Sequence, residues 1–168
     1  MPAVTEAAWS VSAFDYDGPE DNGEFYFYRR NGYIEIREYI GDNTQAVIPK
    51  ELDGLPVLKV GTEDYPFLSG GAQNRVTSIV IPDTVQAIGN CAFKDCAELT
   101  YINVPESVKH IGNSAFEGCT KLKTVRLPKE LDRIWPYCFK DCKALTSIRM
   151  PESIQMIELD AFRNCTSL

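Results

Sequence analysis

The chain repeats itself every 23 residues, and this period constrains the fold more than any other feature of the sequence. Four segments align without a gap over residues 76–98, 99–121, 122–144 and 145–167, and Leu168 opens a further one. Their invariant columns are Pro82, Pro105, Pro128 and Pro151; Ile88, Ile111, Ile134 and Ile157; Phe93, Phe116, Phe139 and Phe162; and Cys96, Cys119, Cys142 and Cys165. A fixed period of this length is typical of a solenoid, in which each repeat forms one coil that packs on its neighbours.

Within each repeat, alternation of apolar and variable places predicts a short strand that ends at the proline. Ile79 and Ile81 hold the fourth and sixth places of the first repeat, whereas the third and fifth places vary in polarity. The following proline lacks a backbone donor and ends the pairing. We therefore expect a parallel sheet of stacked coils, with strands about 4.8 Å apart and short turns or 3-10 segments on the other face.

An irregular coil precedes the regular repeats over residues 43–75. Its strand and proline match the pattern, but Pro49 precedes Pro82 by 33 residues because ELDGLP is inserted after it. Tyr65, Pro66 and Phe67 stand roughly where the Ala-Phe pair of the regular repeats belongs.

The sequence before the irregular coil predicts a cap on the N-terminal end of this solenoid. Two alternating aromatic and β-branched runs within residues 25–42 meet at Asn31-Gly32, which is a strong signal for a β-hairpin. Such a hairpin would cover the apolar end of the first coil. Residues 1–24 hold six acids and no Lys or Arg, and we expect them to form an acidic, partly flexible leader.

The strand, the Ile-Pro step, the Ile-Gly pair, the Ala-Phe pair and the cysteine together resemble the BspA-like class of leucine-rich repeats. The resemblance covers residues 25–168, although Trp135 and Glu158 replace the usual glycine and Cys91 and Cys138 are additional. It implies a leucine-rich-repeat solenoid from a class found in bacteria and some protozoa, often at the cell surface, where several members act as adhesins. The class has no shared catalytic or binding motif, so the resemblance assigns no functional residue.

Charge and hydropathy exclude several classes of partner. The net charge is −7, and the acidic leader accounts for most of it, so the body of the chain lacks the basic face that nucleic acid requires. No stretch reaches the roughly 20 apolar residues of a membrane-spanning helix, so we expect no membrane insertion. The N-terminus lacks the layout of a secretory signal, which leaves the localisation open between the cytoplasm and, as the resemblance implies, the cell surface or exterior.

The cysteine column predicts structure rather than chemistry. A zinc site needs short paired spacings, but the chain has no CxxC motif and a single histidine, His110. We therefore expect no metal and no cofactor, and we interpret the cysteines as free thiols that fill the turns. No catalytic arrangement accompanies His110, so the sequence favours a protein that is not an enzyme.

Two groups of residues are candidates for ligand binding. Places three and five of each strand point away from the core, and there the surface becomes basic towards the C-terminus. The candidates on this face are Tyr101, Asn103, Arg126 and Arg149. The second group is Trp135 and Tyr137 in the motif IWPYCF, whose large rings could equally cover a neighbouring turn.

The pattern stops at Leu168 with no polar capping segment, which leaves three explanations: further repeats, a homodimer through this end, or a frayed terminus. Taken together, the sequence favours a non-enzymatic module that binds a protein or surface polymer on its strand face. The alternative is a structural spacer or assembly element with no discrete ligand.

Overall fold

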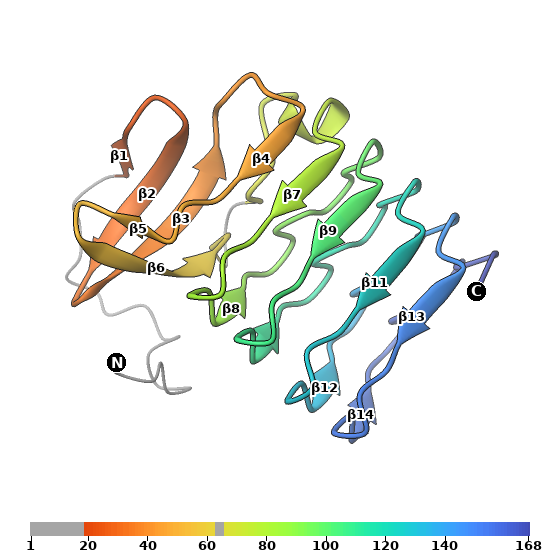
Figure 1. Cartoon of the computed structure of the whole chain (residues 1–168). Coiled ribbons are helices and arrows are strands. Elements are labelled where there is room, and N and C mark those ends of the chain that lie inside the picture. The colour runs from red at the N-terminus through yellow and green to blue at the C-terminus, as the bar shows by residue number, and fades with distance from the viewer. Residues whose placement is uncertain (1–18, 63–65) are drawn as a thin grey trace.

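The computed structural model describes residues 19–62 and 66–168, and residues 1–18 and Tyr65 therefore lie outside the described part of the chain. The described residues form a β-solenoid of about 5 turns whose coils stack side by side (Figure 1). This architecture confirms the predicted fold class. Among the described residues, no helix has the length and hydropathy of a membrane span.

Each regular coil contributes one strand to a front layer and a shorter strand to a rear layer, with the core between them (Figure 1). The front layer consists of β4 (Gln45–Val47), β7 (Ser78–Val80), β9 (Tyr101–Asn103), β11 (Thr124–Arg126) and β13 (Ser147–Arg149). The rear strands of the regular coils are β8 (Ala87–Ile88), β10 (His110–Ile111), β12 (Arg133–Ile134) and β14 (Met156–Ile157). The rear side consists of these short strands and of turns, in agreement with the predicted short turns, and in the described residues the one 3-10 helix is η2 (Ala72–Asn74), in the irregular coil.

The predicted hairpin is present at the N-terminal end. Strands β2 (Phe25–Arg30) and β3 (Tyr33–Tyr39) pair antiparallel, and Gly32 in the turn has φ 85°, a conformation that glycine adopts without strain. The short strand β1 (Glu20–Asp21) extends the hairpin on its outer side. The inner faces of β2 and β3 are buried in the same core as the coils, so the hairpin closes this end of the solenoid.

The insertion ELDGLP forms a small hairpin of its own. Strand β5 (Glu51–Leu52) pairs antiparallel with β6 (Leu55–Val60) around a turn at Asp53 and Gly54, both with positive φ. Strand β6 then pairs in parallel with β3 on one side and with β8 on the other. The irregular coil thereby joins the cap to the regular repeats.

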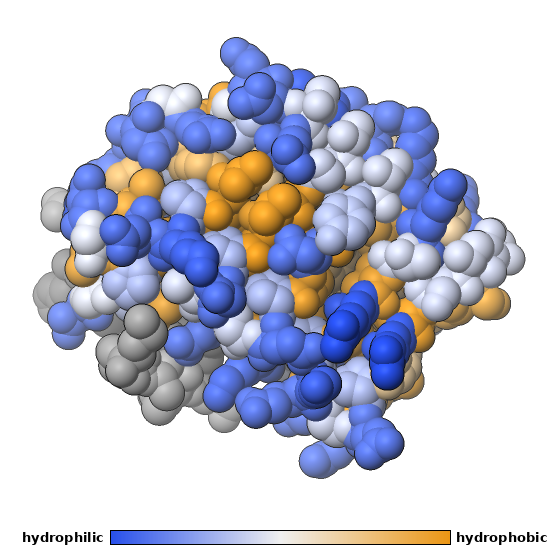
Figure 2. All heavy atoms as spheres, viewed as in Figure 1, coloured by the Kyte–Doolittle hydropathy of each residue, from blue (hydrophilic) through white to orange (hydrophobic). Residues whose placement is uncertain are grey.

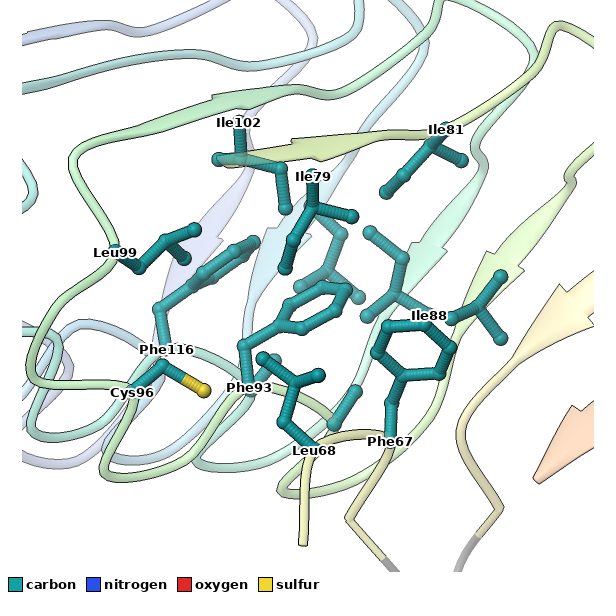
Figure 3. Packing of buried hydrophobic residues seen from close by; sticks show 14 of the residues in the cluster. Phe67, Leu68, Ile79, Ile81, Ile88, Phe93, Cys96, Leu99, Ile102 and Phe116 are labelled. Carbon is teal, nitrogen blue, oxygen red and sulfur yellow. The ribbon is translucent and has the colours of Figure 1, made fainter. Parts of the chain in front are cut away.

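Aromatic rings form one column through the core (Figure 3). It starts at Phe25 in the cap and continues through Phe67 and the phenylalanines of the four repeats, with ring centroids 5.2–6.4 Å apart. Phe116 and Phe139 are stacked with an interplanar angle of 4°. This column links the cap and every coil into one continuous core.

The cysteine column forms a ladder of hydrogen bonds beside the rings. Cys119, Cys142 and Cys165 each lie with Sγ 3.0–3.1 Å from the carbonyl oxygen of the phenylalanine in the preceding coil, so the thiol is placed to donate to it. All six cysteines are free. The column thus contributes polar contacts between coils in addition to the predicted filling of space.

The parallel ladder is interrupted between the second and third regular coils, whereas a continuous ladder was predicted. In the described residues, β9 pairs with β7 and β11 pairs with β13, but β9 and β11 belong to separate sheets. The rear strands β10 and β12 are separated in the same way. We call this boundary the seam.

The seam coincides with the substitution of small residues in the third coil. A Cβ atom on Gly112 would lie 2.6 Å from the backbone nitrogen of Asn90, so the coils before the seam stack too closely for any side chain at this place. The equivalent residue in the third coil is Trp135, and in the fourth coil it is Glu158, whose N–H still donates to Ile134 O at 2.9 Å. Among the described residues, the bond that Gly112 N–H donates to Ile88 O at 2.9 Å has no counterpart at Trp135.

Pro136 removes a second contact at the same point. In the preceding coil the N–H of Asn113 donates to Oδ1 of Asn90 at 2.9 Å, and proline has no N–H to repeat this bond. The coils remain joined along the turn edge, where Phe116 N–H donates to Cys138 O and Gly118 N–H donates to Lys140 O, both at 2.8 Å. The seam is therefore open at the strands and held at the turns.

Candidate binding face

The outward side chains of the front layer form two columns in register. In every front strand the central residue points inward and its two neighbours point outward, as the sequence predicts. The first column holds Gln45, Ser78, Tyr101, Thr124 and Ser147, and the second holds Val47, Val80, Asn103, Arg126 and Arg149. We call this surface the strand face.

The N-terminal half of the strand face is apolar and aromatic. Val47 is 49% exposed and Tyr101 is 56% exposed, and Val80 lies half-buried beside Val47 in the neighbouring strand. Figure 2 shows apolar residues gathered over β4 and β7 in the middle of this view. Val47 and Val80 were not among the predicted site residues, although their apolar side chains at outward places were a signal in the sequence.

The C-terminal half of the strand face is basic. Arg126 and Arg149 are exposed and occupy matching positions on β11 and β13. Nη2 of Arg126 lies 3.0 Å from Oε1 of Glu106, whose other oxygen accepts a hydrogen bond from the backbone N–H of Lys129 at 2.8 Å. Within the described residues, Arg149 forms no ion pair.

Asn103 has an internal role that the sequence did not reveal. Its Oδ1 atom accepts a hydrogen bond from Ile81 N–H, and its Nδ2 atom donates to Ile81 O, both at 2.9 Å. The side chain therefore satisfies the backbone of the preceding coil directly after β7. One N–H and one lone pair of the Asn103 amide are used in these bonds, so the side chain has a structural role beside the predicted binding role.

The seam divides the strand face into two plates. Val47, Val80 and Tyr101 lie on the sheet β4-β7-β9, whereas Arg126 and Arg149 lie on the sheet β11-β13. The apolar and basic halves are therefore carried by separate hydrogen-bonded units.

Trp135 and Tyr137 do not join this surface, because they follow β12 in the rear layer. The Trp135 ring packs edge-on against His110 of the preceding coil at 5.4 Å between centroids, and the Arg133 guanidinium lies 5.0 Å from its centre. Tyr137 has φ 58°, and Lys140 Nζ lies 5.5 Å from its ring. These contacts give Trp135 a partner across the seam, His110 in strand β10.

The buried thiols are unsuited to nucleophilic chemistry. Burial raises the pKa of Cys119, Cys138 and Cys142 well above that of an ordinary thiol, so these side chains stay protonated at neutral pH. Among the described residues, no group of three or more His, Cys, Asp or Glu side chains is arranged to hold a metal ion.

Residues 71–168 match the sequence profile described as the BspA type leucine rich repeat region, with 6 copies. The chain belongs to this family. The BspA-type profile confirms the resemblance expected from the repeat columns. Repeats of this family form scaffolds of the protein-interaction type, and family members are generally binding proteins rather than enzymes. Among curated proteins, none matches this sequence.

Solved structures of bacterial leucine-rich-repeat proteins share the fold. The chain is 28% identical to a leucine-rich-repeat protein of T. pallidum with a TM-score of 0.77, covering 89% of this chain and 69% of that one. A protein from Bacteroides ovatus is 34% identical with a TM-score of 0.76, covering 91% of this chain. The BspA-type chain spans 40% of the length of that protein. A leucine rich cell surface protein from Faecalibacterium prausnitzii is 23% identical over 93% of this chain and 54% of its own, with a TM-score of 0.61, and shows the fold alone.

Proposed function

We propose that this BspA-type chain is a non-enzymatic protein-binding module and that its ligand binds on the strand face. The observation that carries this proposal is the grouping of exposed Val47 and Tyr101 with Arg126 and Arg149 on one face of the solenoid. Tyrosine and arginine are enriched among the residues that dominate protein interfaces. Burial of the exposed apolar side chains beside them would stabilise a complex with a partner.

The rigidity of the face supports this proposal. The central residues Ala46 and Ile79 of β4 and β7 are fully buried, so the backbone below the outward side chains is fixed by the core. Binding to such a preformed surface costs less conformational entropy than binding that must first order a loop of the protein.

Selection of random displayed peptides on the immobilised protein tests the proposal. We expect most of the selected peptides to lose binding to Val47→Asp and Tyr101→Ala, because both changes alter the exposed apolar patch without touching the core. Lys143→Glu is the matched control, since Lys143 is exposed on a turn of the third coil. Peptides that bind all three variants equally would show that the ligand-binding surface lies elsewhere.

We further propose adhesion at a cell surface as the setting of this binding. The support is the resemblance to a class that contains adhesins, together with the extended face described above. Labelling of intact producing cells with an antibody to this domain tests the proposal. Surface labelling supports it, and labelling only after lysis contradicts it.

The runner-up is a structural spacer without a discrete ligand. If the chain is a spacer, the selected peptides should bind at scattered places on the surface, and no single group of variants should weaken the binding of most of them. The uneven distribution of apolar and basic residues on the strand face favours the binding module over this alternative.

A further inference from the structure

The strand face differs in charge from the rest of the molecule. Most of the net charge of −7 belongs to residues 1–24, and the rest of the chain is close to neutral, whereas the outward residues of the five front strands include two arginines and no Asp or Glu. A basic patch without acidic side chains attracts carboxylates locally. The charge distribution therefore favours an acidic ligand at this face.

The two arginines are placed side by side. Arg126 and Arg149 are register partners on adjacent parallel strands, so their like charges lie next to each other on the exposed face. Among the described residues, Glu106 forms its ion pair with Arg126, and its second oxygen accepts a hydrogen bond from a backbone N–H. A carboxylate from a ligand would relieve the repulsion and accept charge-assisted hydrogen bonds from the guanidinium groups.

The apolar half of the strand face lies beside this arginine pair, along the line that runs across the front strands. Val47 and Val80 are register partners in the column that leads to Arg126 and Arg149, and Tyr101 lies in the neighbouring column. Paired strands lie about 4.8 Å apart, and β9 and β11 are not paired, so four strand spacings amount to roughly 19 Å or more, which an extended segment of at least about six residues spans. Aliphatic side chains such as these valines suit apolar side chains better than the hydroxyl groups of a sugar.

We propose that the ligand of the strand face is an acidic polypeptide segment that lies across the front strands. Its apolar or aromatic side chains cover Val47, Val80 and Tyr101, and its carboxylates bind Arg126 and Arg149. The segment bridges the seam, because its two halves rest on separate sheets. This inference rests on the proposed function and adds the chemical class and the direction of the ligand.

The displayed peptides of the previous section test it through their sequences and through a second pair of variants. We expect peptides that bind the strand face to be enriched in Asp and Glu close to Tyr, Trp, Leu or Val. The double variant Arg126→Gln and Arg149→Gln should weaken their binding about tenfold or more and remove most of its salt dependence. The matched control is Lys109→Gln with Lys143→Gln, because both lysines are exposed outside the strand face.

The outcomes separate this inference from the proposed function. Peptides that map to the strand face but lack acids, or that bind the arginine double variant normally, would overturn the acidic ligand and leave the binding face in place. Peptides that map to another surface would overturn both. Thermal unfolding of each variant shows that the fold is retained.

A competition experiment distinguishes a polypeptide from an anionic polysaccharide. Poly-L-glutamate and polygalacturonate carry the same carboxylate chemistry on different chains, and each is added to the complex with a selected peptide. We expect polyglutamate to compete through Arg126 and Arg149. Stronger competition by polygalacturonate at equal carboxylate concentration would contradict a polypeptide ligand.

Discussion

At the scale of single residues, Glu117 ties three coils together across the seam. Its carboxylate lies 2.9 Å from Lys94 Nζ in the first regular coil and 2.7 Å from Lys140 Nζ in the third. Burial by itself would raise the pKa of Glu117, but hydrogen bonds from Lys140, Lys94 and Ser114 outweigh it and hold the pKa at about 2. The ionised carboxylate is therefore favoured by the folded state.

This pKa predicts a contribution of Glu117 to stability that depends on pH. Because the folded pKa of about 2 lies below the ordinary value of 4.5, the contribution is complete above pH 4.5 and is lost as the pH falls through 2. We expect it to amount to about 1–3 kcal/mol of unfolding free energy. Chemical unfolding at a series of pH values should show this loss in the native protein and not in Glu117→Gln. Parallel pH curves for the two proteins would contradict the assignment.

The thiols provide a second prediction at this scale. Cys119, Cys138 and Cys142 are buried and protonated, whereas Cys91 and Cys165 are partly exposed. A thiol reagent at neutral pH should react first with Cys91 and Cys165, and with the buried thiols only as the protein unfolds. Titration in denaturant without reductant should find all 6 thiols free. Fewer than 6, or rapid reaction of the buried thiols in the native state, would contradict this interpretation.

At the scale of strands and turns, the repeat pattern predicted most of the fold. The inward and outward places of the front strands and the packed columns follow from apolar periodicity, because each regular repeat meets nearly the same surroundings. The hairpin lies outside the repeats and follows from Asn31-Gly32 between two alternating runs. The role of Asn103 could not be predicted, because it depends on the distance to Ile81 in another coil. The seam could not be predicted from Trp135-Pro136 in place of Gly-Asn, because Glu158-Leu159 also replaces this pair in the fourth repeat and its strands still pair with those of the third.

The seam predicts a local difference in amide protection. Trp135→Gly combined with Pro136→Asn restores the residue types of the preceding coil, so β11 should approach β9 and complete the ladder. Hydrogen exchange at residues 124–126 should then become slower than in the native chain. Trp135→Ala alone is the control, since it removes the ring but restores no N–H donor. Unchanged exchange in the double variant would mean that other residues hold the seam open.

At the scale of the whole molecule, the two ends of the solenoid differ. The hairpin β2-β3 covers the first coil, whereas the last coil exposes Met156, Ile157 and Leu159 by 45%, 54% and 63%. The equivalents of Ile157 in earlier coils are buried. The exposed end therefore presents both apolar side chains and the free edges of β13 and β14.

We propose that a second copy of the chain covers this end in a homodimer, and further repeats or a frayed terminus are the alternatives. Sedimentation should show a species whose mass rises with concentration, because the apolar surface of one copy covers that of another. Ile157→Lys with Leu159→Lys should shift the equilibrium to the monomer, and Lys143→Glu should leave it unchanged. A monomer at high concentration would contradict this expectation.

The proposed recognition surface consists of an apolar plate and a basic plate on the strand face, with the seam between them. Hydrogen exchange of the native protein with and without a selected acidic peptide tests this account most directly. It predicts slower exchange in β4, β7, β9, β11 and β13, with the largest change at the facing edges of β9 and β11, and no change in β8, β10, β12 or β14. Protection centred on Trp135 and the rear strands, with the front strands unchanged, would contradict it.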